Sequence, residues 1–222
     1  YDEIGWMQED DGNYQNARYE DLRPVSREYI HKTRLRVLNG LIPTGRFILD
    51  AGSGPVQYEE YKTYSAGYQK RVCLDISIQA LREARNRIGD HGLFVVGDLA
   101  NLPFKKDAFD GAVSMHAIHH LALPEHPKAY AEIHRVLAPG RTAAIVNGWH
   151  NPLLIRMAEP LIGLMRKMSG RSEKKKKEWL SEEDPAGTFV QKMTPEWMKR
   201  EIGSKMTIEL KPWRGLSTRI LR

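Results

Sequence analysis

The stretch FILDAGSGP, residues 47–55, places an apolar run, an acid and two glycines within nine positions. Such an apolar run is typical of a strand that is buried on both faces of a sheet. Gly52 and Gly54 allow the chain to turn sharply where the strand ends and let the backbone approach a ligand closely. Asp50 stands at the strand end, where a carboxylate can accept hydrogen bonds. The stretch predicts a strand and a binding turn, although a Gly-x-Gly turn by itself also suits a purely structural role.

Strand and helix patterns alternate through the first two thirds of the chain. Besides the opening strand, apolar strands are expected over residues 70–77, 92–98, 109–118 and 141–149. Helices are expected over residues 24–41, 76–89 and 124–140. Strands that alternate with helices at this spacing form right-handed βαβ units and a parallel sheet. The predicted fold class is therefore α/β, doubly wound and Rossmann-like.

The alternation stops after Trp149. Thr194 followed by proline predicts the start of another helix over residues 194–203. Residues 205–210 and 216–221 alternate like strands about a turn and predict a terminal antiparallel hairpin.

Composition indicates an ordinary globular protein. The chain has 222 residues, of which 41% are hydrophobic and 28% are charged, enough for one large domain with its own core. No apolar run approaches the roughly 20 residues of a membrane-spanning helix, and the acidic N-terminal stretch is unlike a leader. A soluble, cytoplasmic protein is expected. Cys73 is the only cysteine and lies in an apolar run, which predicts an inert buried thiol.

The net charge of +6 belongs to the C-terminal third. Residues 1–150 carry 18 Lys or Arg and 19 Asp or Glu, whereas residues 151–222 carry 16 and 9. A basic region of this kind leaves open docking to nucleic acid. The simpler interpretation of the lysine run at 174–177 is a solvated loop.

Two further acids end the second and third predicted strands. Asp75 comes 25 residues after Asp50, where a carboxylate can accept both hydroxyls of a ribose. Asp98 can accept from an exocyclic amine while Leu99 flanks a base. Because parallel strands end at the same edge of a sheet, the three acids are expected to lie together. The arrangement suits an adenosine that carries an amine or a cation.

The sequence resembles the class I S-adenosylmethionine-dependent methyltransferases, especially the small-molecule group that includes the ubiquinone and menaquinone C-methyltransferases. The resemblance spans residues 45–149 and rests on the motifs LDAGSGP, CLDIS, GDLANLPF, FDGAVSMHAIHHL and EIHRVLAPGRTAAIVNGW. It implies S-adenosylmethionine as the cofactor and a single methyltransferase domain over residues 1–222. It also implies a seven-stranded, mostly parallel sheet of order 3-2-1-4-5-7-6.

The resemblance also assigns roles at the strand ends. It implies that Asp50 and the amides around Gly52 and Gly54 hold the methionine end of the cofactor. Asp75 and Ile76 would contact the ribose, and Asp98 and Leu99 would contact the adenine. Ser114, Met115 and His116 would lie beside the donor methyl. One departure is Val56, which stands with Pro55 where relatives often carry a third glycine, and a valine there is expected to narrow the room beside the methionine.

Several histidines follow the fourth and fifth strands. Methyl transfer requires alignment of nucleophile, methyl and sulfur, and a base only where the acceptor must lose a proton. His116 is the first candidate for such a base and His150 the second. His119 and His120 are expected to be structural. No metal site is expected, because no carboxylate has matching spacing.

The termini and the basic segment are expected to serve the acceptor. Residues 1–40 are interpreted as an N-terminal arm and helix, in which Tyr14 and Tyr19 either close over the site or simply pack against the sheet. Residues 151–187 are interpreted as a helical, basic insert. Its apolar stripe would pack on the domain, roof an acceptor or contact an anionic membrane surface peripherally.

The predicted function is methyl transfer to a small, partly apolar molecule such as a quinone, phenol, lipid or natural product. Two alternatives stay open. One is a nucleic-acid or protein methyltransferase that docks through its basic third, although the Asn-Pro-Pro-Tyr type motif of amino-methylating nucleic-acid enzymes is absent. The other is a catalytically silent cofactor-binding or interaction domain, suggested by Val56. The oligomeric state is left open.

Overall fold

The computed structural model describes residues 23–148 and 190–214. The N-terminal arm before residue 23, the insert at 151–187 and the second half of the expected hairpin at 216–221 lie outside these ranges. Among the helices that the structure describes, none has both the length and the apolar character needed to span a bilayer.

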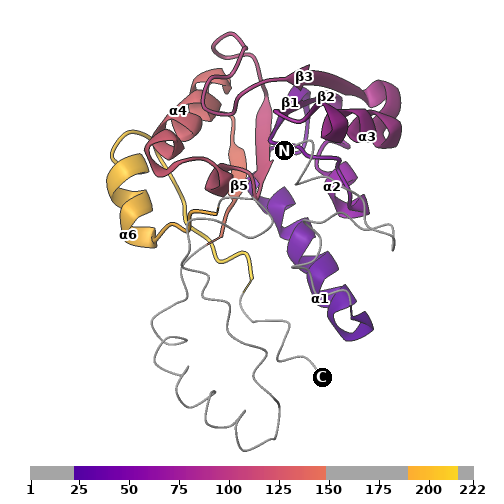
Figure 1. The fold of residues 1–222 in the computed structure, drawn as a ribbon, viewed down its shortest axis with the longest axis horizontal. Helices are drawn as coiled ribbons and strands as arrows, with labels where there is room; N and C mark the ends of the chain where they lie inside the picture. Colours follow the sequence, from indigo (N-terminus) through magenta and orange to yellow (C-terminus); the bar gives the residue numbers. More distant parts are fainter. Residues whose placement is uncertain (1–22, 149–189, 215–222) are drawn as a thin grey trace, which may run out of the picture.

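Five parallel strands form one sheet (Figure 1). They are β1 (Gly45–Ala51), β2 (Tyr68–Asp75), β3 (Gly92–Val96), β4 (Gly111–Met115) and β5 (Ala143–Val146). Their order is β3-β2-β1-β4-β5, so the direction of winding reverses between β1 and β4. This confirms the predicted α/β class and the order of the first five strands. The reversal point is where open α/β sheets bind ligands.

Helices form at each of the positions that the sequence predicts, and also after β1, where none was predicted. They are α1 (Pro24–Leu35), η2 (Arg36–Gly40), α2 (Glu59–Thr63), α3 (Ile78–Ile88), α4 (His126–Val136), and α6 (Pro195–Trp197) continued by the π-helical turn η6 (Met198–Ile202). At the start of α3, Ser77 Oγ accepts the amide of Ala80 at 3.1 Å. Thr194 caps α6 as predicted, since its Oγ1 accepts the amide of Trp197 at 3.1 Å.

Two apolar layers hold the helices on opposite faces of the sheet. Leu49 and Ala51 of β1 face a cluster that includes residues of α4 and η6. Ile48, which directly precedes Leu49, faces a cluster that includes residues of α2 and α3. Figure 1 shows α2 and α3 on one side of the sheet and α4 and α6 on the other. The strand alternation therefore decides which helix each side chain meets.

The predicted strand at 205–210 and its hairpin are not confirmed, and the expected partner at 216–221 lies outside the described residues. Residues 207–210 form no regular structure. Met206, Ile208 and Leu210 nevertheless pack against the apolar cluster on the α4 face. Alternation records which side chains are buried, but a strand also needs a neighbouring edge with which to form a ladder.

Tyr68 packs across the start of β1 and β4. A Cβ atom on Gly45 would lie 2.7 Å from the Tyr68 ring, and one on Gly111 would lie 2.3 Å from its hydroxyl oxygen. The ring is 4% exposed, and its hydroxyl donates to the carbonyl of Ile42. Gly111 has no room for a side chain unless Tyr68 moves, and at Gly45 Asp110 would have to move as well, because its Cβ would lie 2.5 Å from the added atom.

We expect Gly111→Ala to lower the free energy of unfolding by about 1–3 kcal/mol, because the added methyl overpacks a buried site. Gly40→Ala is the matched control, since its Cβ would meet Ala144 at an ordinary 3.4 Å. That change is expected to be neutral or stabilising by up to about 1 kcal/mol. Urea unfolding followed by circular dichroism measures both, and equal midpoints for the two variants would contradict the packing argument.

Candidate functional site

The ends of β1, β3 and β4 meet at Gly52. This residue has a φ of +73°, a conformation that favours glycine. A Cβ atom here would lie 2.3 Å from Cβ of Ala117, which follows β4, and 3.4 Å from Cδ1 of Leu99, which follows β3. The turn after β1 therefore packs directly on the chain that leaves two other strands, as the predicted convergence requires.

The end of β2 holds this turn through three amides. Gly52 and Ser53 both donate to the carbonyl of Leu74, at 2.8 and 3.0 Å. Gly54 donates to Oδ2 of Asp75 at 2.9 Å. These amides thus have partners within the protein, and the expectation that they hold the cofactor's amino acid end stays a prediction.

Asp75 is well placed to bind a pair of hydroxyls. Its side chain is largely buried, and its Oδ1 accepts the amide of Ser77 at 2.9 Å while Oδ2 accepts that of Gly54. Burial raises the pKa of Asp75 above its ordinary value, and these two amides oppose the shift. Each carboxylate oxygen has a further lone pair for a hydroxyl donor. Ile76 beside it is 63% exposed and gives an apolar surface next to the acid.

Asp98 shapes the loop that follows β3. Its Oδ1 accepts the amide of Ala100 at 2.8 Å, and its Oδ2 accepts the side-chain amide of Asn101 at 2.7 Å. Leu99 is buried against the Gly52 turn. The carboxylate is half-buried beside this apolar side chain, which fits a heterocyclic base with an amine at its edge.

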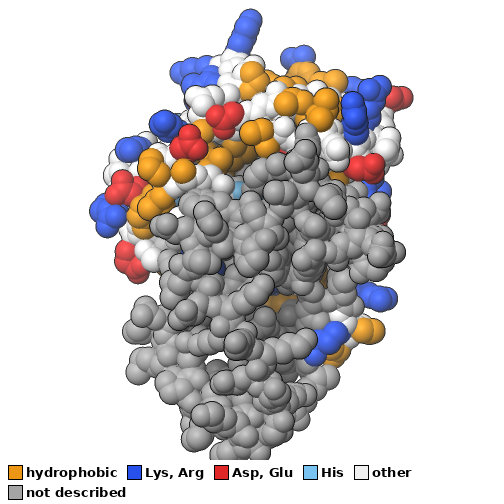
Figure 2. All heavy atoms as spheres, viewed as in Figure 1, with side chains coloured by type: hydrophobic (Ala, Val, Ile, Leu, Met, Phe, Trp, Pro, Cys, Tyr) orange, Lys and Arg blue, Asp and Glu red, His pale blue; other side chains and the backbone are white. Residues whose placement is uncertain are grey.

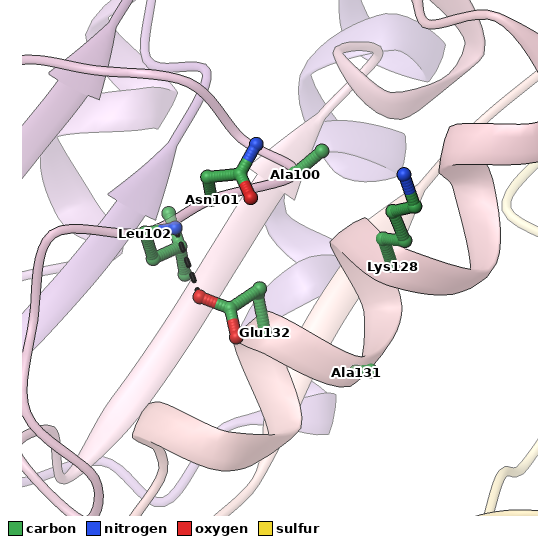
Figure 3. A pocket seen from close by; sticks show the side chains of 6 residues that line it. All are labelled: Ala100, Asn101, Leu102, Lys128, Ala131 and Glu132. Carbon is green, nitrogen blue, oxygen red and sulfur yellow. Dashed lines mark hydrogen bonds between the residues drawn. The ribbon is translucent and has the colours of Figure 1, made fainter.

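A groove of about 490 Å³ lies between this loop and α4 (Figure 3). It is lined by Ala100, Asn101, Leu102, Lys128, Ala131 and Glu132. Oε2 of Glu132 accepts the amide of Leu102 at 2.9 Å across it. None of the predicted site residues lines this groove, which therefore lies beside the predicted site and not within it.

Asp50 forms a buried ion pair that the sequence did not predict. Asp50 and Arg71 are each only 2% exposed, and Arg71 Nε lies 3.0 Å from Oδ2 of Asp50. Burial acts to lower the pKa of Arg71, but the neighbouring groups, first among them the Asp50 carboxylate, together outweigh it, so the pKa lies above its usual value. The available signal was an arginine inside an otherwise apolar strand, because a buried charge requires a partner.

Val56 lies in the core below the turn. It has a φ of +50°, rare for a β-branched residue, and it is 1% exposed. Its side chain belongs to the apolar cluster that includes Tyr61, Tyr64 and Cys73. Its predicted effect on the space beside the methionine stays a prediction.

The end of β4 carries Ser114 and His116. Ser114 Oγ donates to the carbonyl of Ala51 at 2.8 Å and so ties β4 to β1 at the edge where the ligand is expected. His116 has a φ of +57°, and its ring centroid lies 4.8 Å from that of Trp213. Burial lowers the pKa of His116 to about 3. The imidazole is therefore neutral and weakly basic.

Trp213 joins three distant parts of the chain. Its Nε1 donates to the carbonyl of Thr33 in α1 at 2.9 Å, and its own carbonyl accepts from Arg36 at 3.0 Å. Together with the His116 contact, these bonds place α1 and the C-terminal segment beside the end of β4. No signal in the sequence marked Trp213, which lies in a stretch predicted only as a turn.

His119 and Cys73 have the structural environments predicted for them. His119 Nδ1 accepts the amide of Gly148 at 3.0 Å, and burial lowers its pKa to about 2. His119 and His120 lie in the short 3₁₀ helix η4 (Ile118–His120). Cys73 is fully buried, which raises the pKa of its thiol to about 12. His150 lies outside the described residues.

Comparison with known proteins agrees with this geometry. Residues 49–145 match a family model described as a methyltransferase domain. The phthiotriol/phenolphthiotriol dimycocerosates methyltransferase of Mycobacterium leprae is 33% identical over 98 residues, which cover 44% of this chain and 36% of that protein. A second such enzyme, probable, from Mycobacterium ulcerans is 31% identical over 98 residues, 44% of this chain and 37% of that protein. The chain thus matches little more than a third of the length of these relatives.

Solved structures share the fold. The YcgJ protein of Bacillus subtilis has a TM-score of 0.55 at 20% identity, over 79% of this chain and 67% of that one. A Thermotoga maritima protein described as an S-adenosylmethionine-dependent methyltransferase has a TM-score of 0.53 at 19% identity, over 81% of this chain and 71% of that one. Residues 49–145 are therefore similar to a methyltransferase domain, and the chain has the fold of these solved structures.

Proposed function

We propose that this protein transfers a methyl group from S-adenosylmethionine to a small, partly apolar acceptor. The observation that carries the proposal is the meeting of the strand ends at Gly52, with Asp75 bonded to the same turn through Gly54. This arrangement brings acceptor groups for an ammonium, two hydroxyls and an exocyclic amine to one edge of the sheet. Those are the polar groups that an adenosine with an amino acid tail presents.

Each strand end has its own task in this proposal. Asp75 holds the ribose hydroxyls, and Asp98 with Leu99 holds the adenine. The carbonyls of the Gly52 turn, with Asp50, receive the ammonium. S-adenosylmethionine supplies a methyl group on a positively charged sulfur, so the protein needs mainly to align the acceptor with it. Ser114, Met115 and His116 line the side on which the acceptor arrives.

His116 serves as an orienting group in this proposal. An imidazole whose pKa is about 3 stays neutral at physiological pH and is a poor proton acceptor. Its contact with Trp213 instead provides an aromatic wall beside the donor methyl. His150 remains the proposed base for acceptors that must lose a proton.

The acceptor is proposed to be small, and the insert at 151–187 is proposed to cover it. The names of the curated relatives, which act on phthiotriol and phenolphthiotriol dimycocerosates, support screening lipid and phenol acceptors alongside quinones. Figure 2 shows Lys and Arg side chains interspersed with Asp and Glu over the described part of one face. That mixed charge gives no support there to a nucleic-acid docking surface.

We expect Asp75→Ala to lower the affinity for S-adenosylhomocysteine by ~100-fold, because two hydrogen bonds to a charged group are lost. The same variant should weaken 5′-methylthioadenosine equally, since both ligands carry the ribose. Asp90→Ala, which removes an exposed acid, is the matched control and should leave both affinities unchanged. Isothermal titration calorimetry measures each constant. A folded parent protein that binds neither ligand would favour the silent-domain alternative.

We expect the His116 ring signal to show no titration between pH 5 and 9, because its pKa of about 3 keeps it neutral there. The unfolded chain binds that proton near its ordinary pKa of 6.5, so acidification below about 6.5 is also expected to reduce stability. Proton NMR of the histidine Cε1–H signals tests this, with His116→Asn as the assignment control. A midpoint between pH 6 and 8 would restore His116 as a general base.

A further inference from the structure

Arg71 contacts both ends of the segment that contains the glycine turn. From β2, its Nε and Nη2 donate to Oδ2 of Asp50 at the end of β1. Its Nη1 donates to the carbonyl of Tyr61 in α2. The chain between these two contacts, residues 51–60, includes Gly52, Gly54 and Val56. A single guanidinium therefore joins the two ends of this segment, named here the cofactor loop.

The contacts leave one oxygen of Asp50 without a bond. Both Arg71 nitrogens that reach the carboxylate bind Oδ2, and Oδ1 receives no hydrogen bond from any residue that the structure describes. A carboxylate that is 2% exposed is costly to keep charged unless a partner compensates it. Arg71 provides that compensation from the side of the carboxylate that carries Oδ2. The other oxygen retains its capacity to accept.

The planar guanidinium suits this double task. It presents donors in a rigid fork, whereas a lysine ammonium is a point charge on a flexible stem. The fork spans two acceptors on separate elements, Asp50 and Tyr61, while the three turn amides bind β2. Residues 51–60 are thus fixed at the glycine turn by the Leu74 carbonyl and the Asp75 carboxylate of β2, and at both ends by the Arg71 side chain.

We propose that Arg71 is a positioning residue for the methionine end of the cofactor. It holds Oδ2 of Asp50 and the carbonyl of Tyr61, which keeps the cofactor loop in shape and leaves Oδ1 of Asp50 to receive the ligand's ammonium. The inference rests on the proposed function, because it concerns the same ligand. It predicts that Arg71 affects recognition of the amino acid tail and not of the nucleoside.

Two ligands separate these effects. S-adenosylhomocysteine carries the amino acid tail, and 5′-methylthioadenosine lacks it while keeping the adenosine. For Arg71→Lys we expect a loss of about tenfold or more in affinity for S-adenosylhomocysteine, since the fork is lost while the charge stays. The affinity for 5′-methylthioadenosine should change by less than about threefold. Isothermal titration calorimetry gives both constants, and a circular dichroism melt reports whether the variant is folded.

Arg135→Lys is the matched control. Arg135 also binds one carboxylate through two nitrogens, at Glu132, and donates to the carbonyls of Phe104 and Leu102. It lies in α4 and does not contact the cofactor loop. The ratio of the two ligand affinities is expected to stay at the parent value in this variant.

Asp50→Asn changes the other partner of the Arg71 contact. It tests the positioning role of Arg71 if Arg71→Lys fails to fold. It should reproduce the selective loss for S-adenosylhomocysteine, and adding Arg71→Lys to it should cause little further selective loss, because the two residues act through one contact. Equal weakening of both ligands, or no weakening, would overturn the positioning role while leaving the proposed function intact. A parent protein that binds neither ligand would overturn both.

Discussion

The turn after β1 depends on bonds from the end of β2. Two amides of the turn converge on the carbonyl of Leu74, and a third binds the carboxylate of Asp75. These bonds stabilise a left-handed backbone at Gly52 and Gly54 that would otherwise be one of many conformations open to glycine. Because the turn is held in this way, Gly52 can pack on the chain leaving β3 and β4. The arrangement of the strand ends at this edge of the sheet therefore depends on the hydrogen bonds between the turn and the end of β2.

The three acids at the strand ends have equivalent positions in the sequence but different surroundings. Asp50 is paired with a guanidinium, Asp75 with two backbone amides, and Asp98 with the amides of its own loop. Removing one partner of a buried pair such as Asp50 and Arg71 typically costs about 3–5 kcal/mol, because the remaining charge is left uncompensated. The pair is therefore both a structural element of the cofactor loop and a reason for Asp50 to keep a fixed orientation.

Aromatic side chains lie at the end of β4, whereas acids lie at the ends of β1, β2 and β3. His116 and Trp213 form an aromatic surface where the acceptor is proposed to arrive, and the guanidinium carbon of Arg214 lies 4.6 Å from the centroid of the Trp213 ring. In the proposed reaction, an aromatic surface of this kind would align a planar acceptor by stacking. The C-terminal segment provides half of this surface, although it lies about a hundred residues from His116 in the sequence. Its position is secured by bonds to Thr33 and Arg36.

The sequence by itself determined the five parallel strands, the helices α1, α3, α4 and α6, and the positions of the strand-end acids, because apolar periodicity and capping residues are local properties of the chain. Only the tertiary structure decided that Arg71 pairs with Asp50, that the turn amides bind β2, and that burial depresses the pKa of His116. It also decided that residues 207–210 pack without joining a sheet. Each of these outcomes depends on contacts between residues distant in sequence, and neither periodicity nor motif spacing specifies which distant groups will meet.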